Sequence, residues 1–107
     1  MKTLVKVPSK IKIGALKANV GISDYIRVDD GYRGFFNQRT EELRLDTNLG
    51  GRSRDTVFLH EIVHMISINY ESGLSEEDTS RVANGLFEFL YYNLGIELDW
   101  SDICETP

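Results

Sequence analysis

Both histidines of the chain lie in the otherwise apolar run Phe58–Ile66, where His60 and His64 are four residues apart and Glu61 directly follows the first. Side chains four residues apart on a helix point the same way, so both imidazoles can reach one ion. Glu61 lies one position round from His60, close enough to approach a metal-bound water without binding the metal. This H-E-x-x-H spacing is typical of zinc peptidases, in which zinc keeps one position open for water.

A purely structural explanation of the same residues competes with the metal site. A histidine on an apolar helix is usually a core residue whose ring nitrogens are hydrogen-bonded, and two of them can stack against polar neighbours. This chain, however, has only two histidines, and both occupy the frame with the glutamate. Unpaired polar groups are costly on an apolar helix. The metal site is therefore the favoured interpretation.

The expected mechanism follows from these residue types. His60 and His64 bind Zn²⁺ as neutral imidazoles, a third ligand comes from a second helix, and water takes the fourth position. The metal lowers the pKa of that water to about 7. Glu61 takes the proton as the water attacks a carbonyl and then delivers it to the leaving amine.

Two supporting roles stay open on the sequence alone. The candidates for an oxyanion stabiliser are Tyr70, Tyr91 and Tyr92. The second nitrogen of each histidine needs an acceptor that fixes its tautomer. The candidates for that acceptor are Asp46, Asn48, Asp78 and backbone carbonyls.

The third ligand is expected to be a carboxylate, because both histidines are used and Cys104 is remote in sequence. At 100° per residue, Glu76 falls on the side of the second helix that faces the first. Glu77 falls roughly opposite, and Asp78 lies at the margin. Glu76 is therefore the predicted ligand, with Glu77 and Asp78 as alternatives. In the competing interpretation Glu76 only complements the helix dipole.

The elements that must position these residues are predicted from periodicity. Alternating apolar residues and turn signals place strands between residues 3 and 46, including a hairpin in which Leu43 and Leu45 face the core. A helix is expected from about Ser53 to Asn69, apolar nearly all round and therefore buried. A second helix opens at the capping box of Ser75 and ends near Gly95. Other expected features are a strand over Tyr25–Val28, an apolar stripe on the second helix (Val82, Ala83, Leu86, Phe87, Leu90 and Leu94) and a tail, Ile96–Trp100, that packs back on the domain.

Composition narrows the class of protein. A chain of 107 residues predicts one domain over residues 1–107. A net charge of −5, with lysine and arginine concentrated before residue 55, argues against a general nucleic-acid binder. One cysteine excludes an internal disulfide and a multi-cysteine zinc site. Without a recognisable signal peptide or membrane span, the expected compartment is the cytoplasm.

The segment around His60 and His64 resembles the active-site helix of zincin metallopeptidases. Closer still is the resemblance to small metallopeptidase-like proteins of phages and prophages, of gluzincin type. Weaker similarities that follow the same order of elements are Gly34–Asn37, Glu42–Asp46 and Arg81–Leu86. No histidine follows His64, so patterns with a third histidine ligand are excluded.

This resemblance implies a minimal zincin fold of class α+β. A twisted, mostly antiparallel N-terminal sheet would be followed by two long helices, with the strand around Glu41–Asp46 beside the cleft, where an extended substrate pairs with its edge. Glu76 matches the position of the glutamate ligand in that group. The implied activity is zinc-dependent hydrolysis of a peptide or protein substrate. The alternative is a non-catalytic, zinc-stabilised binding module on the same scaffold.

Overall fold

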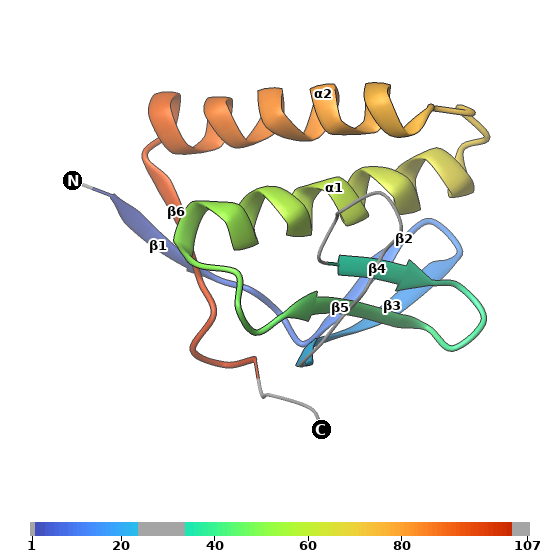
Figure 1. Ribbon diagram of the computed structural model, residues 1–107, viewed down its shortest axis with the longest axis horizontal. Coiled ribbons are helices and arrows are strands. Elements are labelled where there is room, and N and C mark those ends of the chain that lie inside the picture. Colours follow the sequence, from blue (N-terminus) through green and yellow to red (C-terminus); the bar gives the residue numbers. More distant parts are fainter. Residues whose placement is uncertain (1, 24–33, 104–107) are drawn as a thin grey trace.

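The computed structural model describes residues 2–23 and 34–103, which fold into three stacked layers (Figure 1). A four-stranded sheet forms one layer, helix α1 (Gly51–Asn69) lies across it, and helix α2 (Glu76–Glu88) packs on the far side of α1. The expected α+β class, with a sheet and two helices, is confirmed. The strand expected over Tyr25–Val28 lies outside the described residues.

The strand order of the main sheet is β2-β3-β5-β4. Its members are β2 (Lys10–Ile13), β3 (Leu16–Ser23), β5 (Glu42–Asp46) and β4 (Gly34–Asn37). The hairpin of β4 and β5 and the pair of β2 and β3 are antiparallel, but β3 and β5 run parallel, so the sheet is mixed. β5 is an interior strand, so the expectation that a substrate pairs with its edge is wrong. Among the described residues, β4 is the edge strand on that side.

The ends of the described chain meet in a second, smaller sheet. Strand β1 (Thr3–Lys6) pairs in parallel with β6 (Ile96–Asp99), which directly follows the helices. Thr3 is thereby placed opposite Ile96. The expected return of the Ile96–Trp100 tail therefore takes the form of a strand, and the strands are not confined to the N-terminal half.

The core lies between the sheet and α1. Leucines 43 and 45 of β5 are fully buried, as the alternation in that strand predicts. β3 alternates in the same way, and its inward-facing residues are Leu16, Ala18, Val20 and Ile22. Helix α1 contributes Phe58 and Met65 to the same cluster.

The edge strand β4 approaches α1 closely because it begins with a glycine. A Cβ at Gly34 would lie 2.7 Å from Val57 Cγ1 and 2.9 Å from Leu45 Cδ2. Such distances are shorter than packed carbon atoms tolerate, so any side chain here would push the strand away from α1. This contact lies one helical turn before Glu61 and therefore fixes β4 beneath the H-E-x-x-H segment.

Helix α1 was expected to be buried nearly all round, but part of its surface is exposed. Ile66 and Ile68 are 38% and 45% exposed. Four polar residues are instead buried on this helix, namely Asp55, His60, Glu61 and Ser67. Since buried polar groups require partners, these residues mark the positions where α1 must be held by hydrogen bonds. No helix among the described residues is long and apolar enough to cross a bilayer.

Helix α2 begins as predicted, with the Ser75 hydroxyl accepting the Asp78 N–H at 3.1 Å. After Glu88 the chain continues as a short π-helix, Phe89–Asn93, and ends with Gly95 at φ +66°. The predicted apolar stripe divides between two faces. Ala83 is fully buried, whereas Val82 and Leu86 lie on the solvent side.

The N-terminal half of α1 is anchored to the segment after β6 through a buried carboxylate. Asp55 is 6% exposed and accepts a hydrogen bond from Trp100 Nε1 at 2.7 Å. The Trp100 ring also packs edge-on against Phe58, with ring centroids 5.1 Å apart. Burial raises the pKa of Asp55, although the Trp100 bond acts in the opposite direction.

Substitution Asp55→Asn should stabilise the protein at neutral pH. The native pKa lies above the unfolded value of about 3.9, so the charged carboxylate costs native stability above the native pKa. That cost disappears as the pH falls to about 4. Asparagine keeps an oxygen for Trp100 without the charge. Denaturant unfolding with a chelator present should show a stability gain that shrinks from pH 7 toward pH 4.

The matched control is Asp102→Asn, at a side chain that is 56% exposed. It should change stability little at any pH in this range. A stability difference for Asp55→Asn that is independent of pH would contradict the assigned cause of the shift.

Candidate metal centre

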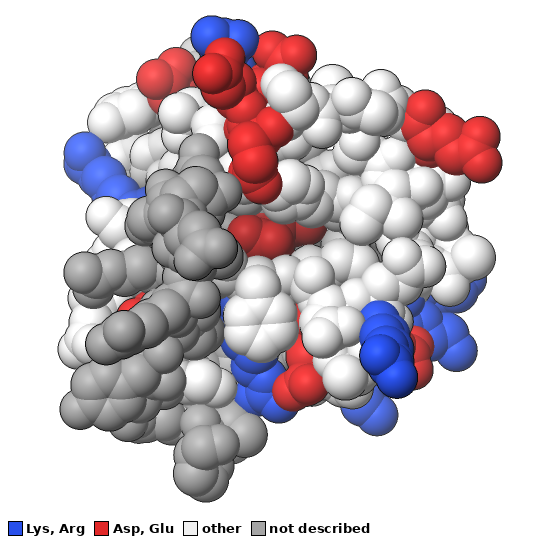
Figure 2. Space-filling model, turned by 45° about the vertical axis from the view of Figure 1, so that its right-hand side comes forward, with Lys and Arg blue, Asp and Glu red and all other residues white. Residues whose placement is uncertain are grey.

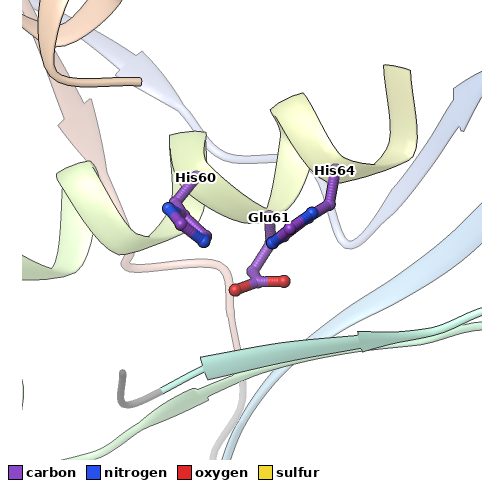
Figure 3. A group of neighbouring side chains, drawn as sticks. All are labelled: His60, Glu61 and His64. Carbon is purple, nitrogen blue, oxygen red and sulfur yellow. The ribbon is translucent and has the colours of Figure 1, made fainter. Parts of the chain in front are cut away.

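The two histidines project from one face of α1 (Figure 3). Their ring centroids are 4.7 Å apart. His60 is only 2% exposed, whereas the His64 side chain is 25% exposed. One imidazole is thus enclosed in the protein and the other borders solvent, so the pair can be reached from outside on the His64 side.

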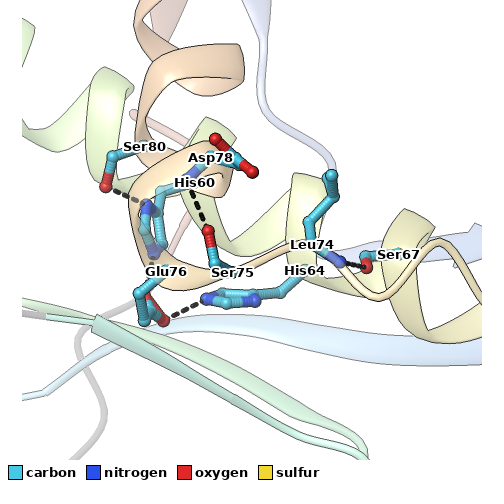
Figure 4. A network of polar contacts seen from close by, with 8 residues as sticks. All are labelled: His60, His64, Ser67, Leu74, Ser75, Glu76, Asp78 and Ser80. Atoms are coloured by element: carbon cyan, nitrogen blue, oxygen red, sulfur yellow. Dashed lines mark hydrogen bonds and ion pairs between the residues drawn. The ribbon is translucent and has the colours of Figure 1, made fainter.

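The carboxylate of Glu76, the first residue of α2, lies between the two rings (Figure 4). Its Oε2 is 3.0 Å from His60 Nε2, and its Oε1 is 2.6 Å from His64 Nε2. The helical phase expected for Glu76 is therefore correct. The alternatives Glu77 and Asp78 instead form exposed ion pairs with Arg81, at 3.7 and 3.0 Å.

The sequence gives no obvious reason why a residue so soon after His64 should return to it. Helix α1 continues to Asn69, so the connection must double back sharply. Ser67 holds it there: its hydroxyl accepts the Leu74 N–H at 3.1 Å and its carbonyl accepts the Ser72 N–H at 3.0 Å. The reversal uses left-handed backbone at Glu71 (φ +53°) and Gly73 (φ +61°). These bonds bring the start of α2 back alongside His64.

The second ring nitrogen of His60, Nδ1, lies beside a hydroxyl group. Ser80 Oγ lies 3.3 Å from His60 Nδ1. Without a metal, an Nε2–H group can donate to Glu76 while Nδ1 accepts from Ser80. With a metal on Nε2, Nδ1 carries the proton and donates to Ser80 instead. A hydroxyl serves both tautomers because it is donor and acceptor at once.

Glu61 has a different surrounding from Glu76. It is 5% exposed, and its carboxylate points from α1 toward the sheet (Figure 3). Its oxygen still belongs to the same cluster, since one ligand atom each from His60, Glu61 and His64 all lie within 4.8 Å of one another. A carboxylate at this distance can reach a water molecule held between the histidines.

The donor set suits zinc. Two imidazole nitrogens and one carboxylate oxygen are the ligands of a common catalytic zinc site. In a tetrahedral zinc site, neighbouring ligand atoms lie about 3.3 Å apart. The nitrogen–oxygen separations of 3.0 and 2.6 Å are a few tenths of an ångström shorter. The Glu76 side chain must therefore move outward before an ion can lie between these groups.

Acidic side chains gather on one face of the molecule. Figure 2 shows acidic side chains running from the upper edge of one face toward a hollow in its middle, where further acidic atoms lie. Most of the lysine and arginine atoms on that face lie below the hollow. Because the start of α2 carries Glu76, Glu77 and Asp78, the local potential favours a cation.

The three tyrosines considered as oxyanion stabilisers have other partners or are exposed. The hydroxyls of Tyr91 and Tyr92 both accept hydrogen bonds from Arg52 at 3.1 Å. Arg52 is two turns before His60, about 12 Å along the helix. Tyr70 follows α1 and is 64% exposed.

Two of the three side chains proposed as histidine acceptors, Asp46 and Asp78, have other partners. Asp46 Oδ1 accepts the Asn48 N–H at 2.8 Å, and Asp78 pairs with Arg81. Ser80 takes this place beside His60, and sequence reasoning missed it. Its signal was a spacing of four residues from Glu76, which puts both on one face of α2.

No family model, curated protein or solved structure matches this chain. Any chemistry proposed for the site therefore rests on the geometry of four side chains, those of His60, Glu61, His64 and Glu76.

Substitution Ser80→Ala should weaken zinc binding by about 10- to 100-fold, the usual effect of removing a hydrogen-bond partner from a ligating histidine. Competition with a chromogenic chelator measures this affinity directly. Ser80→Thr retains the hydroxyl and should restore binding to near the wild-type value. Equal affinities for the alanine variant and the wild type would exclude this role of Ser80.

Proposed function

We propose that this protein is a zinc-dependent peptidase in which His60, His64 and Glu76 hold the ion and Glu61 acts as general base. One observation carries the proposal. The two Nε2 atoms converge on the carboxylate of Glu76, while a second carboxylate, that of Glu61, has an oxygen within 4.8 Å of a nitrogen of each histidine. A catalytic site needs a carboxylate beside the metal-bound water as well as its three protein ligands, and the four side chains supply both.

Each residue then has a defined task. Zinc in such a site supplies a Lewis acid that polarises a carbonyl and lowers the pKa of water to about 7. Glu61 accepts the proton of the attacking water and returns it to the departing amine. Its burial beside the sheet limits the directions in which its carboxylate can point. Ser80 keeps the His60 ring oriented from the α2 side.

The proposed substrate is an extended peptide that lies along β4. Among the described residues this strand is the sheet edge next to α1, and the Glu61 carboxylate points from α1 toward the sheet (Figure 3). Backbone hydrogen bonds to an edge strand bind peptides with little dependence on sequence. The scissile bond would then face Glu61.

Zinc should bind with a stoichiometry of one ion per chain and raise the melting temperature of the metal-free protein. His60→Ala and His64→Ala should abolish the zinc-dependent shift, because each removes one nitrogen ligand, and Glu76→Gln should reduce it strongly. Differential scanning calorimetry with and without a chelator measures the shift, and metal analysis gives the stoichiometry. Absence of both would exclude the metal centre.

Substitution Glu61→Gln should preserve zinc affinity and abolish peptide cleavage, since it removes the base and leaves all three proposed ligands. Turnover is best measured by mass spectrometry on a diverse peptide library. The matched control is Glu77→Gln, at a side chain that is 83% exposed, which should cleave like the wild type. Equal turnover of Glu61→Gln and wild type would refute the role of Glu61.

The sequence also allows a zinc-stabilised module without catalysis, and the same measurements separate the two functions. In that case the zinc-dependent shift would persist in the wild type while no library peptide is cleaved. Glu61→Gln would then be indistinguishable from the wild type in every measurement.

A further inference from the structure

The outer face of α2 and the first residue of the π-helix that follows it form an apolar stripe that no other described element covers. Val82, Leu86 and Phe89 are 43%, 38% and 52% exposed. Their spacing of four and three residues aligns them along one side of the helix. Figure 1 shows α2 as the outermost layer, with α1 on one side only. The stripe contributes little to the core of a single chain.

Gly85 lies within this stripe and has no evident use in a single chain. Glycine destabilises a helix interior relative to alanine, and close packing is the usual compensation. A Cβ added at Gly85 would meet no atom within 4 Å. The close helix contact that this glycine permits is therefore not made by any described part of the same chain.

Opposite charges lie on one edge of the stripe. Arg81 and Glu88 are seven residues apart and thus share a side of the helix. The Arg81 side chain is 72% exposed, and its ion pairs with Glu77 and Asp78 lie at the surface. Among residues 2–23 and 34–103, no ion pair involves the Glu88 carboxylate.

We propose that two copies of this chain associate through α2, with the two helices packed antiparallel about a two-fold axis near Gly85. The arrangement of the residues is self-complementary. Val82 would contact Phe89 of the second copy, and Leu86 would lie over Gly85 of the second copy. Arg81 would pair with Glu88 of the second copy, twice by symmetry. All three residue pairs are centred on Gly85 to within one residue, as a two-fold axis requires.

The small area of the stripe limits the expected affinity between the two copies. A contact between two helices of this length is small beside the roughly 1,600 Å² buried in stable complexes, which places it with weak, transient associations. The dimer should therefore be weak and form only at high protein concentration. The site around Glu76 lies on the opposite side of α2, so association leaves it open, and this proposal does not depend on the proposed peptidase activity.

Sedimentation equilibrium of the full chain tests the proposal. Between about 10 µM and 1 mM, the range suited to a weak association, the mean mass should rise from 12.2 kDa toward twice that value. Gly85→Leu should remain a monomer while keeping or raising the melting temperature, because the single chain has room for the side chain. A chain that stays monomeric at all these concentrations, or a Gly85→Leu variant that still dimerises, would overturn the proposal.

Charge exchange gives a second, independent test. Glu88→Arg should weaken the dimer at least tenfold by placing two arginines opposite each other. Combining it with Arg81→Glu should restore association. Val82→Glu places a charge in the stripe and should prevent dimerisation. The matched control is Ile68→Glu on α1, where the isoleucine is 45% exposed, and this variant should dimerise like the wild type. Loss of the dimer in Ile68→Glu, or no recovery in the double exchange, would contradict this geometry.

Discussion

His60 is a buried imidazole on α1, and its hydrogen bonds determine how the two helices pack. A polar ring at 2% exposure requires partners for both nitrogens. Helix α2 provides a partner on each side of the ring, Glu76 at Nε2 and Ser80 at Nδ1. These two residues are one helical turn apart, so they clasp the ring only at one rotation and one height of α2. The requirements of a single side chain thus fix the register between the helices.

The connection between the helices is short for the path that it must follow. Only six residues separate the end of α1 from Glu76, and the chain must nevertheless retreat along α1 to the level of His64. Ser67 makes this possible by binding the connection at two points. The left-handed conformation of Glu71 costs roughly 1 kcal/mol for a residue with a Cβ. The turn is therefore held by hydrogen bonds from α1 rather than by its own conformational preference.

Local patterns in the sequence were sufficient for several parts of the structure. Helical phase placed Glu76 on the inner face of α2, and strict alternation placed Leu43 and Leu45 in the core. The same alternation is present in Leu16–Ser23, so strand β3 was predictable although it was not predicted. Features that depend on distant partners were not. The parallel pairing of β3 with β5 and the hydrogen bonds of Ser67 follow from tertiary packing.

The apolar residues of α2 lie on two faces, and only one face packs against α1. The helical pattern in the sequence does not show which apolar residues a neighbouring element covers. Periodicity identified the H-E-x-x-H helix but not the acceptor for His60. Ser80 has no property in isolation that marks it, and its role depends on where α2 lies. The residues that converge at the site were therefore predictable from the sequence, whereas the residue that contacts His60 from α2 was not.

The pairing of β1 with β6 has a consequence for the order in which the molecule assembles. Thr3 lies opposite Ile96, so this contact closes a loop of nearly the whole chain. Loop closure of this length is entropically unfavourable until intervening elements have folded. All four residues of β1 are exposed, and they bring little apolar burial to offset that cost. The N-terminal strand should thus dock last in folding and detach first in native-state fluctuations, with its amides exchanging hydrogen while the sheet and helices remain intact.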